Sequence, residues 1–164
     1  MKYLLPILVL LLPCTALADT DAGDIEKLTV EWLSGWSTSP EKPFTLDNVA
    51  HLYVKDDSLV SFDFGRPFDG VRGWAHAAEY YPKFMAQVAY WKLNPNDDME
   101  VTVRGDIAWS TVSLSAEARL PDGTEMKIPE GRVTLIFERR VGGWLIVHEH
   151  GSAALPFPND PEKL

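Results

Sequence analysis

The chain has 164 residues, with 15 lysines and arginines against 24 aspartates and glutamates, and a formal net charge of −9. This length suits a single domain with its own hydrophobic core. The acidic balance argues against nucleic acid or an anionic membrane surface as a partner, because both attract dense positive charge.

The first eighteen residues have the pattern of a secretory signal peptide. Lys2 supplies the positive start, residues 4–12 form an apolar run, and small residues precede a cleavage site after Ala18. The run is shorter than the roughly 20 residues that span a bilayer. We therefore expect a periplasmic or secreted protein without membrane insertion, with a domain at residues 19–155 and a flexible tail at 156–164.

A lipidated Cys14 is an alternative, although Pro13 stands where lipoprotein signals carry a small residue. If cleavage follows Ala18, the mature chain has no cysteine. It would then carry no disulfide and no thiolate metal site.

Apolar residues at helical spacing predict three helical segments in the first half of the chain. The first helix is capped by Asp21 or Asp24, the second is capped by Thr45, and the third begins near Val71. We expect Pro82 to kink or divide the third helix, because it lacks a backbone donor. The apolar face of the first helix consists of Ile25, Leu28, Trp32, Leu33 and Trp36.

The pattern changes to strands after residue 98. Residues 59–64 predict one early strand, and four more are predicted at residues 99–103, 107–120, 124–139 and 144–152. Asp122 and Gly123 form a hairpin signal. The layout predicts an α+β fold, in which a curved antiparallel sheet packs on three N-terminal helical segments.

Strict alternation along the last predicted strand assigns its residues to two faces. One face holds Trp144, Ile146, His148, His150 and Ser152, and the other holds Leu145, Val147 and Glu149. Both faces carry apolar residues, but the helices can cover only one of them. We expect a second subunit to cover the other face, which predicts a homodimer.

The segment RVTLIFERRVGGWLIVHEHGSAALP, residues 132–156, resembles the closing hairpin of the SnoaL-like families in the nuclear transport factor 2 superfamily. It is especially similar to the association domain of calcium/calmodulin-dependent protein kinase II and its bacterial relatives. Residues 52–73 are similar to the helix end, first strand and turn of such domains, and Gly105 and Asp106 match their short turn. The resemblance implies a cone-shaped fold with a pocket at its wide end.

The superfamily includes ketosteroid isomerase, scytalone dehydratase and polyketide cyclases, as well as domains that only bind or oligomerise, so the fold does not name a function. In ketosteroid isomerases an aspartate base lies on the first strand. Phe62 aligns with that position, and Asp63 follows one residue later on the opposite face of a regular strand. Asp63 is therefore either a general base in the cavity or a residue that bonds the backbone of the next turn.

His148 and His150 are predicted about 6–7 Å apart on one strand face. Ligand contact or proton transfer suits imidazole near neutral pH, and a structural role in backbone or dimer contacts is the alternative. We predict no metal site, because no third ligand stands at a recognisable spacing. The chain has no glycine-rich phosphate loop or dinucleotide motif, so no cofactor is expected.

The resemblance gives Arg132 a role in ligand binding, since the matching arginine of the kinase association domain lines a pocket for carboxylate-bearing ligands. A guanidinium can bind a carboxylate through two hydrogen bonds. The alternative is an ion pair with Glu117, Glu125 or Glu130. The candidate aromatic pocket walls, each of which could also be ordinary core, are Tyr53, Trp74, Tyr81, Trp91 and Trp109.

Three functions remain open from the sequence. The first is an exported binding or accessory protein whose pocket takes a small, partly apolar ligand, carboxylated if Arg132 contacts it. The second is an isomerase, dehydratase or cyclase, in which Asp63, His148 or His150 moves a proton. The third is an oligomerisation module.

Overall fold

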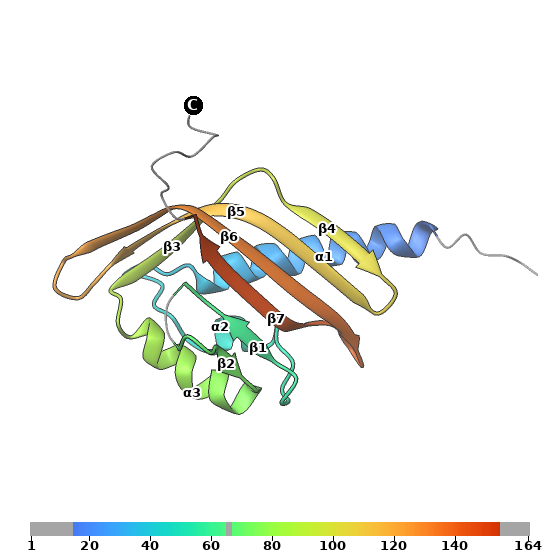
Figure 1. Ribbon diagram of the computed structural model, residues 1–164, viewed down its shortest axis with the longest axis horizontal. Coiled ribbons are helices and arrows are strands. Elements are labelled where there is room, and N and C mark those ends of the chain that lie inside the picture. The colour runs from blue at the N-terminus through green and yellow to red at the C-terminus, as the bar shows by residue number, and fades with distance from the viewer. Residues whose placement is uncertain (1–14, 65–66, 155–164) are drawn as a thin grey trace, which may run out of the picture.

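The computed structural model describes residues 15–64 and 67–154 and shows a mixed α+β domain built on one curved sheet (Figure 1). The helices are α1 (Thr15–Trp36), α2 (Asp47–Ala50) and α3 (Trp74–Met85). The strands are β1 (Val60–Phe62), β2 (Val71–Arg72), β3 (Tyr90–Pro95), β4 (Glu100–Arg104), β5 (Ile107–Arg119), β6 (Glu125–Arg140) and β7 (Gly143–Ala153). The predicted fold class is confirmed.

The proposed signal peptide falls mostly outside the described residues, as do Cys14 and the C-terminal tail. Helix α1 begins at Thr15, before the expected cleavage site. Within residues 15–64 and 67–154, no helix is long and apolar enough to cross a membrane.

The strands are ordered β2-β1-β7-β6-β5-β3, and β4 pairs with β5. All pairs are antiparallel except β1 and β7, which run parallel and place Ser61 opposite Glu149. This pair brings two distant parts of the chain together. The sequence did not predict β2 or β3, because β2 has two residues and β3 ends in Asn94 and Pro95, which usually break strands. Proline is tolerated here because β3 is an edge strand.

Helix α1 lies against β3, β4 and β5 and covers one face of the sheet, which we call the inner face (Figure 1). Its predicted apolar face is confirmed by the burial of Ile25, Trp32, Leu33 and Trp36. The predicted start at Asp21 or Asp24 is wrong, because the helix begins at Thr15. Asp21 lies within α1, where its carboxylate pairs with Arg139 at 2.5 Å.

Helix α3 continues through Pro82 to Met85, so the expected division at Pro82 does not occur. The proline removes one backbone donor, but its own carbonyl accepts a hydrogen bond from Ala86 at 3.0 Å. Tyr81 and Met85 are buried on either side of it, and their packing holds the last turn in place.

Strand β7 contains an extra residue, Val147, in a bulge where its register with β6 shifts. Before the bulge Ile146 points to the inner face and is fully buried, and after it Glu149 does, with 6% of its surface exposed. His148 and His150 face the opposite, outer side, where they pair with outward residues of β6. The prediction that Ile146 shares a face with the two histidines is wrong, because one extra residue reverses the alternation.

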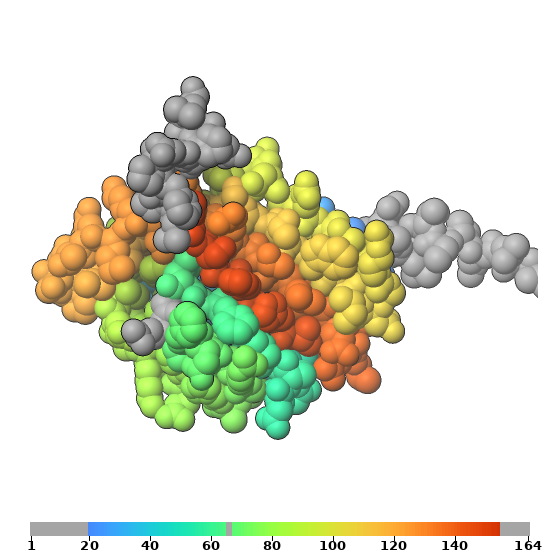
Figure 2. All heavy atoms as spheres, viewed as in Figure 1, coloured from blue at the N-terminus to red at the C-terminus, as the bar shows by residue number. Residues whose placement is uncertain are grey.

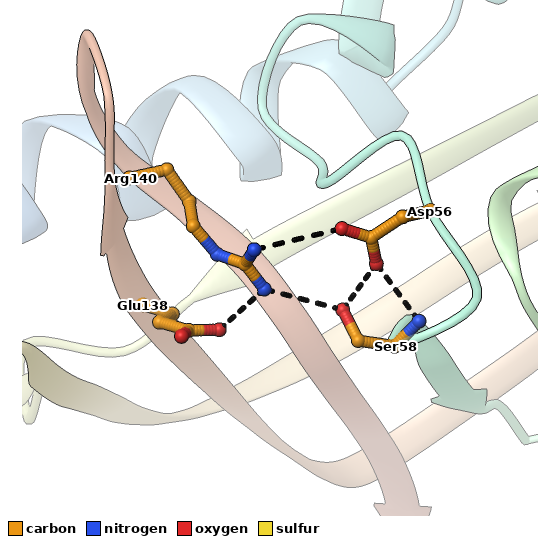
Figure 3. A network of polar contacts seen from close by, with 4 residues as sticks. All are labelled: Asp56, Ser58, Glu138 and Arg140. Carbon is orange, nitrogen blue, oxygen red and sulfur yellow. Dashed lines mark hydrogen bonds and ion pairs between the residues drawn. The ribbon is translucent and has the colours of Figure 1, made fainter.

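A cluster around Arg140 fixes the loop that leads into β1 (Figure 3). The guanidinium of Arg140 contacts Glu138 at 2.6 Å, Asp56 at 3.6 Å and the Ser58 hydroxyl at 3.4 Å. The Ser58 backbone N–H and hydroxyl both donate to Asp56, and these bonds lower the pKa of that carboxyl. The loop is thereby attached to the end of β6, next to the start of β1.

The predicted hairpin at Asp122 and Gly123 joins β5 to β6, with the Gly123 N–H donating to the Leu120 carbonyl at 3.0 Å. Gly123 has φ of 90°, which the turn requires. The hairpin projects beyond the rest of the domain (Figure 2).

Candidate functional site

A buried carboxylate lies at the centre of the domain. Tyr53 OH and Trp32 Nε1 donate to Oε2 of Glu149 at 2.5 and 3.0 Å, and Ser61 Oγ and Tyr81 OH donate to Oε1 at 2.5 and 2.9 Å. Trp32 comes from α1, Ser61 from β1 and Tyr81 from α3, while Tyr53 follows α2. A carboxylate only accepts hydrogen bonds, so four donors suit its ionised form and offset the cost of burying its charge.

The two tyrosines of this cluster are held in their protonated form. Burial, and then the negative charge of Glu149, raise the pKa of Tyr53 and of Tyr81 well above the usual value. Tyr53 OH also accepts hydrogen bonds from the indoles of Trp32 at 2.7 Å and Trp36 at 3.0 Å. The hydroxyl proton of Tyr53 is thereby directed at Glu149.

A small cavity, which we call the inner cavity, lies beside Glu149. Its free volume is about 30 Å³, which is room for about one water molecule. Its lining residues are Trp32, Trp36, Phe62, Asp63, Phe64, Phe84, Trp91, Leu93, Val133, Glu149 and Gly151. The charged members of this set are the two acids, Asp63 and Glu149, and most of the rest are aromatic.

Asp63 immediately follows the last residue of β1 and lines the inner cavity. Burial of its carboxyl raises its pKa to about 6. A hydrogen bond from the Phe64 N–H at 2.6 Å opposes this shift, and the charge of Glu149 adds to it. The residue as a whole is nevertheless exposed to solvent, because it also lines a groove on the outside, so solvent weakens this upward shift. A carboxyl group with this pKa can accept or release a proton near neutral pH.

The outer groove has a volume of about 430 Å³, within the range of small-molecule sites. It is lined by Phe62, Asp63, Phe64, Pro67, Phe68, His148 and His150. The Phe62 ring lies 5.9 Å from the His148 imidazole and 5.8 Å from that of His150, centre to centre. Burial, and then the neighbouring His150, lower the pKa of His148. The three residues predicted to move protons thus lie around one groove, but only Asp63 also reaches the inner cavity.

The comparisons with known proteins place this domain in a family. Residues 45–156, more than half of the chain, match the family described as SnoaL-like domain. The chain belongs to this SnoaL-like family. The resemblance seen in the sequence is thereby confirmed.

Solved structures with the same fold resemble this SnoaL-like domain at low sequence identity. A nuclear transport factor 2-like protein from Salmonella enterica has a TM-score of 0.72 and 20% identity, covering 87% of this chain and 97% of its own. A candidate dehydratase from Streptomyces avermitilis has a TM-score of 0.70 and 19% identity, covering 84% and 99%. A candidate association domain of calcium/calmodulin-dependent protein kinase II from Xanthomonas campestris has a TM-score of 0.57 and 21% identity, covering 84% and 86%. No curated protein matches the chain.

Arg132 lines a different hollow from the other candidates in the SnoaL-like domain. It is exposed and lines a separate hollow of about 230 Å³ together with Asn96 and Ser113. Glu125, one of its expected partners, pairs instead with Arg119 at 2.9 Å. The structure therefore places Arg132 in a different hollow from Asp63 and the histidines, although on the outer face it is a diagonal neighbour of His150.

Of the five predicted aromatic wall residues, three lie at the inner site and two lie away from it. Tyr53 and Tyr81 bond Glu149, and Trp91 lines the inner cavity. Trp74 lies outside the cavity, where the Lys55 Nζ is 3.2 Å from its ring centre. Trp109 lies on the outer face, since its neighbours along β5 are buried on the inner one.

Sequence reasoning missed Glu149 as a site residue, along with its donors Trp32 and Ser61. The available signal was an acid in the middle of an apolar strand, which is rarely buried unless it is paired. The two flanking histidines drew attention instead. Among the described residues, no group of three or more histidine, cysteine, aspartate or glutamate side chains could hold a metal ion.

Proposed function

We propose that this SnoaL-like domain binds a small, neutral, largely apolar molecule at the inner cavity, and that Asp63 exchanges a proton with it. One observation carries the proposal. Asp63 has a pKa of about 6 and lies between the aromatic inner cavity and the ligand-sized outer groove. Perturbed acids in a hollow are typical of functional sites.

The lining favours a neutral ligand over a carboxylated one. Among the described residues that line it, the charged ones are Asp63 and Glu149, so the carboxylate of a ligand would meet like charge. Arg132, the expected partner of a carboxylate, lies in another hollow. The aromatic walls instead supply apolar contact area and keep water out.

Proton transfer in such a place would make the protein an isomerase, dehydratase or cyclase. With a pKa of about 6, Asp63 is mostly ionised at pH 7 and can take a proton from a carbon next to a carbonyl group. It can then return that proton to another carbon of the same molecule. The shared fold with a candidate dehydratase is consistent with this class of reaction.

The proton step is tested with cyclohex-3-en-1-one, a neutral ring ketone whose isomerisation gives an absorbing conjugated enone. We expect the wild type to catalyse it, with a rate that rises with pH through about 6 as Asp63 ionises. Asp63→Asn should lower the rate by about 100-fold or more, the contribution typical of a general base. Asp97→Asn, a change at an exposed aspartate of a loop, is the matched control and should keep the full rate. Equal rates in wild type and Asp63→Asn would remove the proton step and leave binding alone.

The small volume of the inner cavity favours a second candidate, an oligomerisation module. The outer face of the sheet carries half-buried apolar side chains, including Trp109, Ile136 and Val147. A homodimer through this face would cover them. Sedimentation of the wild type at micromolar concentration tests this, and a stable monomer would count against it.

Export is also part of the proposal. A periplasmic or secreted protein would begin at Asp19, after cleavage following Ala18. This cleavage is tested by identifying the N-terminal residue of the protein purified from the periplasm of a Gram-negative host. Recovery of the uncleaved chain in the cytoplasm would contradict it.

A further inference from the structure

The ring of Phe64 rests on two glycines of neighbouring strands. A Cβ atom placed on Gly151 of β7 would lie 3.1 Å from the Phe64 ring, and one on Gly131 of β6 would lie 3.4 Å from it. Neither glycine has a positive φ, so the backbone itself does not require glycine at these positions. At Gly151 the nearest atoms that a side chain would meet are those of the Phe64 ring, whereas at Gly131 the side chain and the carbonyl oxygen of Leu114 are nearer, at 3.0 and 3.2 Å.

Phe64 also forms part of the wall between the two hollows of the site. It lines both the inner cavity, with its free volume of about 30 Å³, and the outer groove of about 430 Å³. The inner cavity cannot hold a ligand while the ring stays in place, but the groove has room for the ring. A rotation of one side chain would therefore enlarge the cavity beside Asp63.

We infer that the Phe64 ring occupies the place of a six-membered ring of the ligand, and that binding moves it from the two glycines into the outer groove. The inference rests on the proposed binding site and names its ligand class, a neutral molecule that carries one such ring. The glycines form the floor on which the ligand ring lies. The acids, Asp63 and Glu149, disfavour anionic analogues of the same size, because like charges repel.

The probe for this inference is 4-fluorobenzyl alcohol, whose binding is measured by fluorine NMR. Phe64→Ala leaves an apolar space of ring size, and such spaces bind small aromatic molecules. We expect this variant to bind the probe about 10-fold more tightly than the wild type, because the wild type must first displace its own ring. Met126→Ala, a change on the projecting hairpin, is the control and should bind like the wild type. Adding Gly151→Ala to Phe64→Ala should weaken binding again, since the methyl group occupies the floor.

A second measurement needs no destabilising change. With 4-fluorophenylalanine at position 64 of the wild-type chain, saturation with unlabelled benzyl alcohol should shift the fluorine signal. A bound probe with an unchanged signal would overturn the inference, as would a folded Phe64→Ala variant that binds no more tightly than the control. The isomerisation assay reads the proton step separately, so tight binding without turnover would refute only that part of the proposed function.

Discussion

The two faces of β7 differ sharply, although their polar residues are adjacent in the sequence. On the inner face Glu149 is buried and receives four hydrogen bonds from three secondary-structure elements and a loop. On the outer face His148 and His150 contact Phe62 and line an open groove. A buried acid surrounded by donors holds the elements together, whereas partly exposed imidazoles beside a groove can exchange their contacts for water at little cost. We therefore expect large structural effects inside and small ones outside.

The largest contrast should come from removing the inner acid. Glu149→Leu leaves the two tyrosines and the serine without their acceptor, while the Trp32 indole keeps Tyr53 OH, and buried unpaired donors are costly. We expect a loss of about 3 kcal/mol in the free energy of unfolding, measured by urea denaturation with tryptophan fluorescence. His150→Leu on the outer face should change stability by no more than about 0.5 kcal/mol. Similar losses in the two variants would show that the inner cluster does not stabilise the domain.

The next largest effect concerns how Tyr53 and Glu149 depend on each other within the inner cluster. Tyr53→Phe removes one donor to Glu149 and one acceptor of two indoles, and should cost about 1–2 kcal/mol in the wild type. In the Glu149→Leu background the same change should cost much less, because its main partner is already absent. The coupling is measured by a double-mutant cycle in urea. Costs that simply add would mean that the two side chains act independently.

This contrast also explains how far the sequence could predict the molecule. The three helices, the strands other than β2 and β3, the apolar face of α1 and the Asp122–Gly123 turn follow from local patterns, and they were predicted. The position of Glu149 depends on one extra residue, Val147, which leaves the local pattern of the strand unchanged but reverses its faces. The pairing of β1 with β7 joins segments separated by most of the chain, so no local periodicity reports it.

Asp63 illustrates the same limit. Strand alternation placed it on the face opposite to that of the aligned catalytic position. β1 ends at Phe62, so the alternation rule no longer applies one residue later, and the carboxyl reaches the inner cavity. Similarly, Arg132 was assigned by resemblance, and its outward orientation depends on the register of β6 with both neighbours. In each case the decisive information lies in long-range strand pairing.

The smallest expected effect is a pH dependence of stability that has opposite signs for Asp63, at the inner cavity, and for His148, on the outer face. The pKa of Asp63 is raised to about 6, above its unfolded value, so its contribution to stability is complete at low pH and is lost as pH rises through about 6. The pKa of His148 is lowered, so its contribution is lost as pH falls below the unfolded value. Asp63→Asn should abolish the first pH dependence, which amounts to at most about 1 kcal/mol because solvent screens part of the charge. His148→Asn should abolish the second. Urea denaturation from pH 4 to 8 measures both, and slopes of the same sign in the two difference curves would mean that the two groups do not lie in the environments described above.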